Sequence, residues 1–111
     1  MVHAVGLAWA ERIKGGDRIA ITYFGDGATS EGDFHAAMNF AGVFQVPCVF
    51  VCQNNHWAIT VPVKDQTATR TIAEKAIAYG FEGVRCDGND VFDVYETVRQ
   101  AVEKARAGGG P

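Results

Sequence analysis

The sequence predicts an α/β fold, a three-layer αβα sandwich with a parallel sheet, and three observations support that prediction. Two runs of strand length, Arg18–Phe24 and Pro47–Gln53, are rich in β-branched and aromatic residues. The segment between them, from Glu31 to about Phe44, contains no proline and follows a glycine-rich turn. An amphipathic segment from about Val91 to Ala107 closes the chain. A strand–helix–strand crossover makes the two strands parallel, and helices then cover the sheet.

The other elements follow from local signals along the chain. Residues from about His3 to Lys14 predict a helix that ends at Gly15-Gly16. The stretch from His56 to Lys64, interrupted by a proline, predicts an irregular or edge segment. Thr71 with Glu74 three positions later predicts a capped short helix that stops at Gly80, and Val84–Cys86 predicts a third strand. We therefore expect residues 1–111 to form a single domain.

The helix predicted from Glu31 to about Phe44 has apolar side chains at nearly every angle around its axis. Thr29 or Ser30 is its expected N-cap. A helix that is apolar all round must be buried all round. One face of this helix can pack on the sheet. We expect the opposite face to be covered by a protein partner, unless other helices of this same chain cover it. His35 and Asn39 project together from this helix, either as structural residues or as polar groups near a ligand or partner.

The composition bounds the possible functions. The formal net charge is −3 and 48% of residues are hydrophobic, so the chain lacks the basic excess of a nucleic-acid-binding protein. No apolar run approaches the length that spans a membrane, and no secretory signal is recognisable at the start. Cys48 and Cys52 lie about 13 Å apart along one strand, beyond disulfide reach. The cysteines predict a reduced, intracellular protein.

Two short motifs predict a metal-diphosphate site. Gly25-Asp26-Gly27 follows the first strand, and Asn54-Asn55 follows the second. The carboxyl ends of parallel strands meet at one edge of the sheet, so Asp26 and Asn55 are expected to meet there. Mg²⁺ prefers carboxylate and neutral oxygen ligands, and glycines let a backbone approach a phosphate closely. Each motif alone is more often a plain turn or loop, and their combination in this context reverses that judgement.

The motifs together resemble the thiamine diphosphate fingerprint. Within that group the chain is similar to the alpha subunit of the decarboxylating component of 2-oxo acid dehydrogenase complexes. The resemblance covers essentially the whole chain and is carried by Phe24–Phe34, Asn39-Phe40-Ala41, Gln53-Asn54-Asn55, Ala58-Ile59, Asp87–Asp90 and Gly109-Gly110-Pro111.

The resemblance implies a partial thiamine diphosphate-binding fold with thiamine diphosphate and Mg²⁺ as cofactors. By that resemblance the metal ligands are Asp26, the side chain of Asn55 and the backbone carbonyl of Trp57. The turn made by Gly25 and the amides around Gly27 and Ala28 would face the diphosphate. Trp57 stands where relatives often have a tyrosine or another aromatic residue, and its indole either walls the site or only packs. No residue of this chain is expected to be catalytic itself.

The reaction implied is oxidative decarboxylation of a 2-oxo acid, with acyl transfer to a lipoyl group. The implied partners are a beta subunit that grips the aminopyrimidine, a second alpha subunit, a lipoyl-bearing acyltransferase component and a small 2-oxo acid. The family's alpha subunit is several times longer and includes a later loop with catalytic histidines. The chain is therefore expected to be a fragment that holds the cofactor-anchor core, binds the cofactor weakly alone and does not turn over.

Alternatives to this function remain open from the sequence. Another thiamine diphosphate enzyme, transketolase-like or acetoin-cleaving, would share both motifs. The third alternative is non-enzymatic: a small magnesium-binding or receiver-like αβ domain, or a remnant kept as an interaction module. The substrate is open too. The run Asp87–Phe92 looks closer to the branched-chain 2-oxo acid enzymes, whereas Gln53-Asn54-Asn55 and the run Pro62–Thr67 look closer to bacterial pyruvate enzymes. The expected location is the bacterial cytoplasm, or the mitochondrial matrix in a eukaryote.

Overall fold

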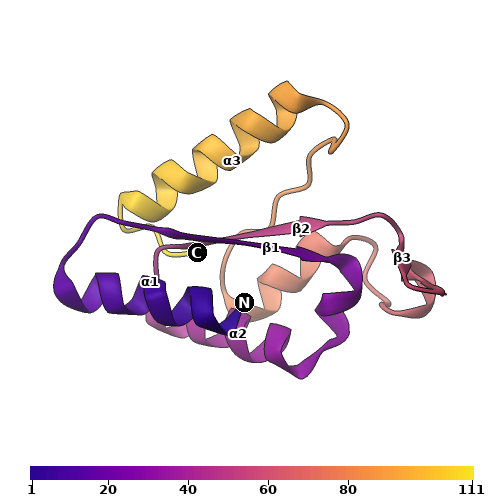
Figure 1. Cartoon of the computed structure of the whole chain (residues 1–111), viewed down its shortest axis with the longest axis horizontal. Coiled ribbons are helices and arrows are strands. Elements are labelled where there is room, and N and C mark those ends of the chain that lie inside the picture. Colours follow the sequence, from indigo (N-terminus) through magenta and orange to yellow (C-terminus); the bar gives the residue numbers. More distant parts are fainter.

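A computed structural model describes all residues, 1–111, and confirms an α/β domain with a parallel sheet. Two helices lie on one side of the two main strands and a third helix lies on the other (Figure 1). A one-turn 3₁₀ segment follows the first strand, and a longer one, packed against the second helix, comes before the third. The elements are α1 (Val2–Lys14), β1 (Ala20–Gly25), η1 (Asp26–Ser30), α2 (Gly32–Phe44), β2 (Cys48–Gln53), β3 (Trp57–Ala58), β4 (Val61–Pro62), η2 (Val63–Asp65), η3 (Ile72–Tyr79) and α3 (Val91–Arg106).

The main sheet consists of β1 and β2, which pair in parallel from Ala20 opposite Cys48 to Gly25 opposite Gln53. The prediction of a third strand at Val84–Cys86 is wrong, because these residues pair with neither strand and Val84 is exposed. β-propensity reflects packing against neighbouring strands, and this segment has none beside it.

The crossover between β1 and β2 follows the predicted order with one correction. η1 intervenes between the strand and α2, so the N-cap of α2 is Glu31, which makes no side-chain cap bond. Thr29 and Ser30 are therefore not N-caps of this helix. Both residues belong to η1 instead, and the Thr29 hydroxyl donates a hydrogen bond to the carbonyl of Asp26 over 2.8 Å.

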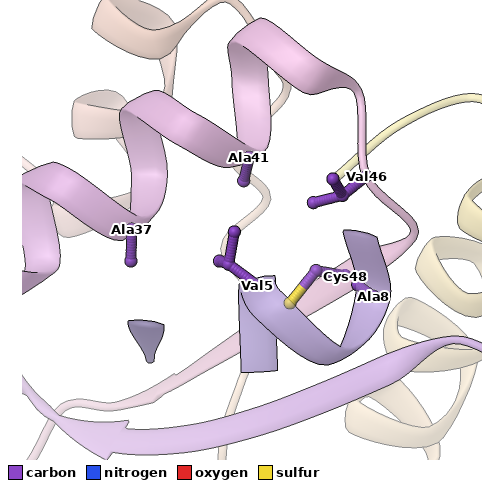
Figure 2. Close-up of a cluster of buried hydrophobic side chains, with 6 residues drawn as sticks. All are labelled: Val5, Ala8, Ala37, Ala41, Val46 and Cys48. Carbon is purple, nitrogen blue, oxygen red and sulfur yellow. The ribbon is translucent and has the colours of Figure 1, made fainter. Parts of the chain in front are cut away.

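The core lies on the α1 and α2 side of the sheet. Its largest cluster joins two small residues of α2 to two residues of α1 and to the start of β2 (Figure 2): Val5, Ala8, Ala37, Ala41, Val46 and Cys48. A second cluster joins Phe34 and Met38 of α2 to Ala76 of η3. Small side chains let α2 approach α1 and η3 closely, so this half of the molecule is tightly packed.

The cap predicted at Thr71 and the stop predicted at Gly80 are confirmed. The Thr71 side chain accepts a bond from the Glu74 amide, and Gly80 ends η3 in the left-handed conformation, although the segment is 3₁₀ where an ordinary helix was expected. Asp90 caps α3 by accepting from the amides of Phe92 and Asp93. No helix is long and apolar enough to cross a bilayer.

Two helices are less covered than their sequences predict. α1 and η3 contact one face of α2, and its outer face leaves Ala36, Phe40 and Val43 exposed, Phe40 at 48% and Val43 at 66%. His35 is also exposed, and its Nδ1 forms a hydrogen bond with the Tyr79 hydroxyl, which supports its structural interpretation. The apolar face predicted for α3 is buried only toward its C-terminal end, at Ala105.

Candidate functional site

The sheet brings the two motifs to one edge of the molecule. Gly25 and Gln53 are the last paired residues of β1 and β2. Asp26 and Asn54 are therefore the residues that come directly after this last pair, on neighbouring strands. The short strand β3, which follows the asparagine pair, contacts η1. The sequence prediction that the two motifs come to the same edge therefore agrees with the topology.

Asp26 is the first residue of η1 and is only 2% exposed. Its carboxylate receives one side-chain hydrogen bond, from Gln66 Nε2 to Oδ2 over 3.4 Å, at the long end of the usual range. Buried charges in proteins are normally paired or bound to metal ions. A buried carboxylate with a single distant neutral donor is well suited to bind a cation.

The two glycines that flank Asp26 have different surroundings, so the need for glycine differs between them. A Cβ on Gly27 would lie 2.7 Å from the Cβ of Ala58, so a glycine is required where η1 packs on β3. Gly25 has an ordinary extended backbone, with φ −83, and a Cβ there would meet nothing within 4 Å. The backbone at Gly25 therefore does not require glycine, and the space beside it is open.

Asn54 and Asn55 both shape the loop that they begin. Asn54 Oδ1 accepts from the His56 amide over 2.8 Å, and Asn55 Oδ1 accepts from the Trp57 amide over 2.9 Å. These bonds hold the backbone of His56 in the left-handed region, at φ 71, a conformation that residues other than glycine rarely adopt. A carboxamide oxygen has two lone pairs, so Asn55 Oδ1 retains one for a cation.

The Trp57 carbonyl lies outside the β3–β4 ladder. Val63 donates its amide to the carbonyl of His56, which makes Trp57 and Pro62 the pair that exchanges no hydrogen bonds. The Trp57 carbonyl is consequently directed away from β4. Its indole is 54% exposed and lines an open cleft of about 560 Å³ together with His56, Pro62, Val63, Lys64, Thr67, Ala68, Thr69 and Arg70.

Electrostatics at this edge involve residues that sequence reasoning missed. Burial, and then the negative charge of Asp26, raises the pKa of Cys52 at the end of β2 to about 11, while Lys75 opposes the rise. Burial also lowers the pKa of Lys75 itself. Lys75 and Gln66 come from later segments, and no motif in the sequence connected either of them with Asp26.

No group of three or more His, Cys, Asp or Glu side chains is arranged to hold a metal ion. The oxygen donors at this edge are one carboxylate and neutral oxygens from Asn55 and Trp57. Such a donor set suits a hard cation whose remaining ligands are water or phosphate oxygens. It does not suit a structural zinc centre, which needs four Cys or His ligands.

Comparison with known proteins gives a consistent result. The family model described as "Dehydrogenase E1 component" matches residues 1–111. The chain is 54% identical over 110 residues to a protein of Mycobacterium tuberculosis named "3-methyl-2-oxobutanoate dehydrogenase subunit alpha", covering 99% of this chain and 30% of that protein. It is 47% identical over 109 residues to "2-oxoisovalerate dehydrogenase subunit alpha" of Bacillus subtilis, covering 98% of this chain and 33% of that protein.

A third relative bears the name of a different substrate. The chain is 46% identical over 110 residues to "Pyruvate dehydrogenase E1 component subunit alpha" of Staphylococcus aureus, covering 99% of this chain and 30% of that protein. The chain thus spans about a third of the length of these curated relatives.

Proposed function

The chain belongs to the dehydrogenase E1 component family, and we propose that it is the part of a 2-oxo acid dehydrogenase alpha subunit that anchors Mg²⁺ and the diphosphate of thiamine diphosphate. The reaction served is oxidative decarboxylation of a 2-oxo acid, with transfer of the acyl group to a lipoyl group. When bound, thiamine diphosphate supplies a thiazolium ring that accepts the electron pair left as carbon dioxide departs.

The buried carboxylate of Asp26 is the observation that carries this proposal. It is 2% exposed, meets one distant neutral donor and lies at the carboxyl edge of a parallel sheet. Asp26, the free lone pair of Asn55 and the outward carbonyl of Trp57 would be the metal ligands. These oxygens fit Mg²⁺, which takes few protein ligands and completes its shell with phosphate oxygens and water.

The diphosphate would lie against the turn. Gly25 leaves open space where a side chain would otherwise project, and Gly27 and Ala28 are the second and third residues of η1. Peptide amides donate to phosphate oxygens, and glycine allows the close approach that this needs. In this proposal the chain holds and orients the cofactor, and none of its residues takes part in bond making or breaking.

Partners would cover the faces that the chain leaves open. The exposed stripe of Ala36, Phe40 and Val43 on α2 supports a contact with the beta subunit or a second alpha subunit, since exposed apolar patches of this kind mark interfaces. The lipoyl-bearing acyltransferase component would meet the assembled enzyme. In that assembly residues 1–111 would act as one partial domain of a three-layer thiamine diphosphate-binding fold, in the bacterial cytoplasm.

The substrate is proposed only as a small 2-oxo acid. The relatives' names include both branched-chain and pyruvate dehydrogenases, at 54%, 47% and 46% identity. Assaying the complete protein with its partner subunits against pyruvate and 3-methyl-2-oxobutanoate would decide between them.

The cofactor site is tested by calorimetry on the complete protein. Thiamine diphosphate is titrated in excess Mg²⁺ into the native protein and into Asp26→Ala, Asn55→Ala and Gly25→Val variants. We expect losses of affinity of at least about a hundredfold for Asp26→Ala, because removing a charged partner costs about 3 kcal/mol or more, and about tenfold for Asn55→Ala. Asp33→Ala, an exposed acid in the first turn of α2, is the matched control and should bind normally. Equal affinity in all four variants would show that the site lies elsewhere.

A further inference from the structure

Lys75 reaches from η3 to the turn that holds Asp26. Its Nζ lies 3.1 Å from the carbonyl oxygen of Thr29 and 3.1 Å from Thr29 Oγ1. The Thr29 hydroxyl in turn donates to the carbonyl of Asp26 over 2.8 Å. A short chain of hydrogen bonds therefore joins the ammonium group to the backbone of Asp26, through Thr29, which lies 46 positions before Lys75 in the sequence.

The ammonium group has no carboxylate partner. The ion pairs of the chain are Arg70 with Glu74, and Arg99 with Glu96 and Glu103, and none includes Lys75. Lys75 Nζ lies 5.7 Å from the centre of the Phe34 ring, which is 1% exposed. An unpaired charge directed inward costs free energy, and burial accordingly lowers the pKa of Lys75. The usual surface role of a lysine does not explain this placement.

The charges of Lys75 and Asp26 act on the same small region. Both shift the pKa of the Cys52 thiol, and they do so in opposite directions: Asp26 raises it and Lys75 lowers it. The Lys75 charge is fixed by its two bonds to Thr29, which is itself only 2% exposed. A positive charge held beneath η1 must repel a bare cation at Asp26 and attract an anion that binds over the turn.

We infer that Lys75 is a positioning residue that holds η1 in shape and adds the fixed positive charge by which the turn favours a diphosphate over a bare metal ion. The inference rests on the proposed function and deepens it. Lys75 acts through Thr29 and the electrostatic potential of the turn, with no contact to the reacting atoms. Removal of the charge should therefore weaken the binding of the diphosphate without weakening the binding of a bare metal ion.

The test uses the complete protein and two ligands. Thiamine diphosphate is titrated by calorimetry in excess Mg²⁺, and Mn²⁺ alone is titrated by electron paramagnetic resonance. Lys75→Met should raise the Kd of thiamine diphosphate by about tenfold and leave the Kd of Mn²⁺ unchanged or lower. Lys75→Arg, which keeps the charge, should restore diphosphate binding to within about threefold of the native value. Lys14→Met, at the exposed end of α1, removes the same charge far from the turn and should alter neither constant.

The outcomes separate this inference from the function on which it rests. Native affinity for thiamine diphosphate in Lys75→Met would overturn the inference and leave the proposed function standing. Equal weakening of both ligands, with a matching fall in melting temperature and no rescue by arginine, would reduce Lys75 to a structural residue and also overturn it. A native protein that binds no thiamine diphosphate would overturn the proposed function itself, and the inference with it. If Lys75→Met does not fold, Lys75→Gln replaces it, with the same tenfold rise expected and native affinity again decisive against the inference.

Discussion

The two faces of the β1–β2 sheet differ sharply in how far they are covered. Alternation along β1 directs Ala20 and Phe24 toward α1 and α2, where they pack against the two buried clusters. The same alternation directs Ile21 and Tyr23 to the α3 side, where Tyr23 is 64% exposed (Figure 1). η1 contacts α2, and Lys75 reaches η1 from η3, so part of the support for the turn at Asp26 comes from the covered side.

This difference indicates which half depends on the rest of the protein. On the packed side, large and small residues of α1, α2 and η3 form two buried clusters within this chain. On the α3 side, Val91, Phe92 and Tyr95 stand exposed at the start of the helix. Apolar side chains left in this way need cover from other residues or from another subunit. The sheet face under α3 therefore depends on such cover, as does the exposed stripe on the outer side of α2.

The largest expected contrast is between two phenylalanines. Phe34→Ala removes a ring that is 1% exposed and packs edge-on against Phe24, so the free energy of unfolding should fall by about 3–5 kcal/mol. Phe92→Ala removes a ring that is 80% exposed, and should change it by less than about 0.5 kcal/mol. Urea denaturation of both variants measures the difference. Similar losses would mean that the α3 face is as well packed as the other.

Two glycines should respond to alanine with opposite signs. A Cβ on Gly42 of α2 would collide with the backbone carbonyl of Tyr79, so Gly42→Ala should destabilise by about 1–3 kcal/mol. A Cβ on Gly6 of α1 would meet nothing, and Gly6→Ala should stabilise that helix by about 0.5–1 kcal/mol. Thermal melts of the two variants give the signs directly. A stabilised Gly42→Ala variant would contradict the close contact between α2 and η3.

The cap of α3 should matter less than packing on the other face. Asp90 Oδ1 accepts from the Phe92 amide over 2.9 Å and from the Asp93 amide over 3.3 Å. Asp90→Ala should cost about 1 kcal/mol, and Asp90→Ser should recover most of that loss because serine also caps helices. Circular dichroism at 222 nm during urea denaturation measures both. A serine variant no better than alanine would indicate that the acid acts by some route other than capping.

The smallest effect concerns an exposed carboxylate on α3. Hydrogen bonds from Arg99, and then from Gln100, lower the pKa of Glu96 from 4.5 to about 2. A lowered pKa in the folded state means that its contribution to stability is present above pH 4.5 and is lost as the pH falls toward 2. The group is fully exposed, so the effect on unfolding should be slight. Titration followed by carboxyl NMR should show the low pKa, and Arg99→Ala should return it toward 4.5. An unchanged pKa in that variant would exclude the arginine as its cause.

The crossover unit could be predicted from the sequence because its signals are local. Apolar runs, the absence of proline between Glu31 and Phe44 and the glycine after α1 fix the elements, and the parallel crossover brings both motifs to one edge. The N-cap assignment failed because Thr29 and Ser30 were used by η1. The strand at Val84–Cys86 failed because propensity cannot supply a neighbouring strand.

The supporting contacts of the candidate site could not be predicted. Gln66 and Lys75 meet η1 from 40 and 46 positions away, and nothing in their local sequence marks them. The loop of Asn54 and Asn55 was predicted, but the backbone bonds of both side chains and the left-handed His56 were not. Such contacts depend on tertiary distance, which one sequence does not contain.

The register of β1 against β2 limits how this chain can change in length. Six consecutive pairs run without a bulge and end at Gly25 and Gln53. An insertion of one residue within β1 would turn each later side chain of the strand to the opposite face. It would also move Asp26 out of alignment with Asn54, which now follows the same last pair of the sheet. An insertion in the exposed stretch between α1 and β1, around Asp17, would leave that relation intact. Homologous sequences that keep the function should therefore differ in length before β1 and keep β1 itself at a constant length.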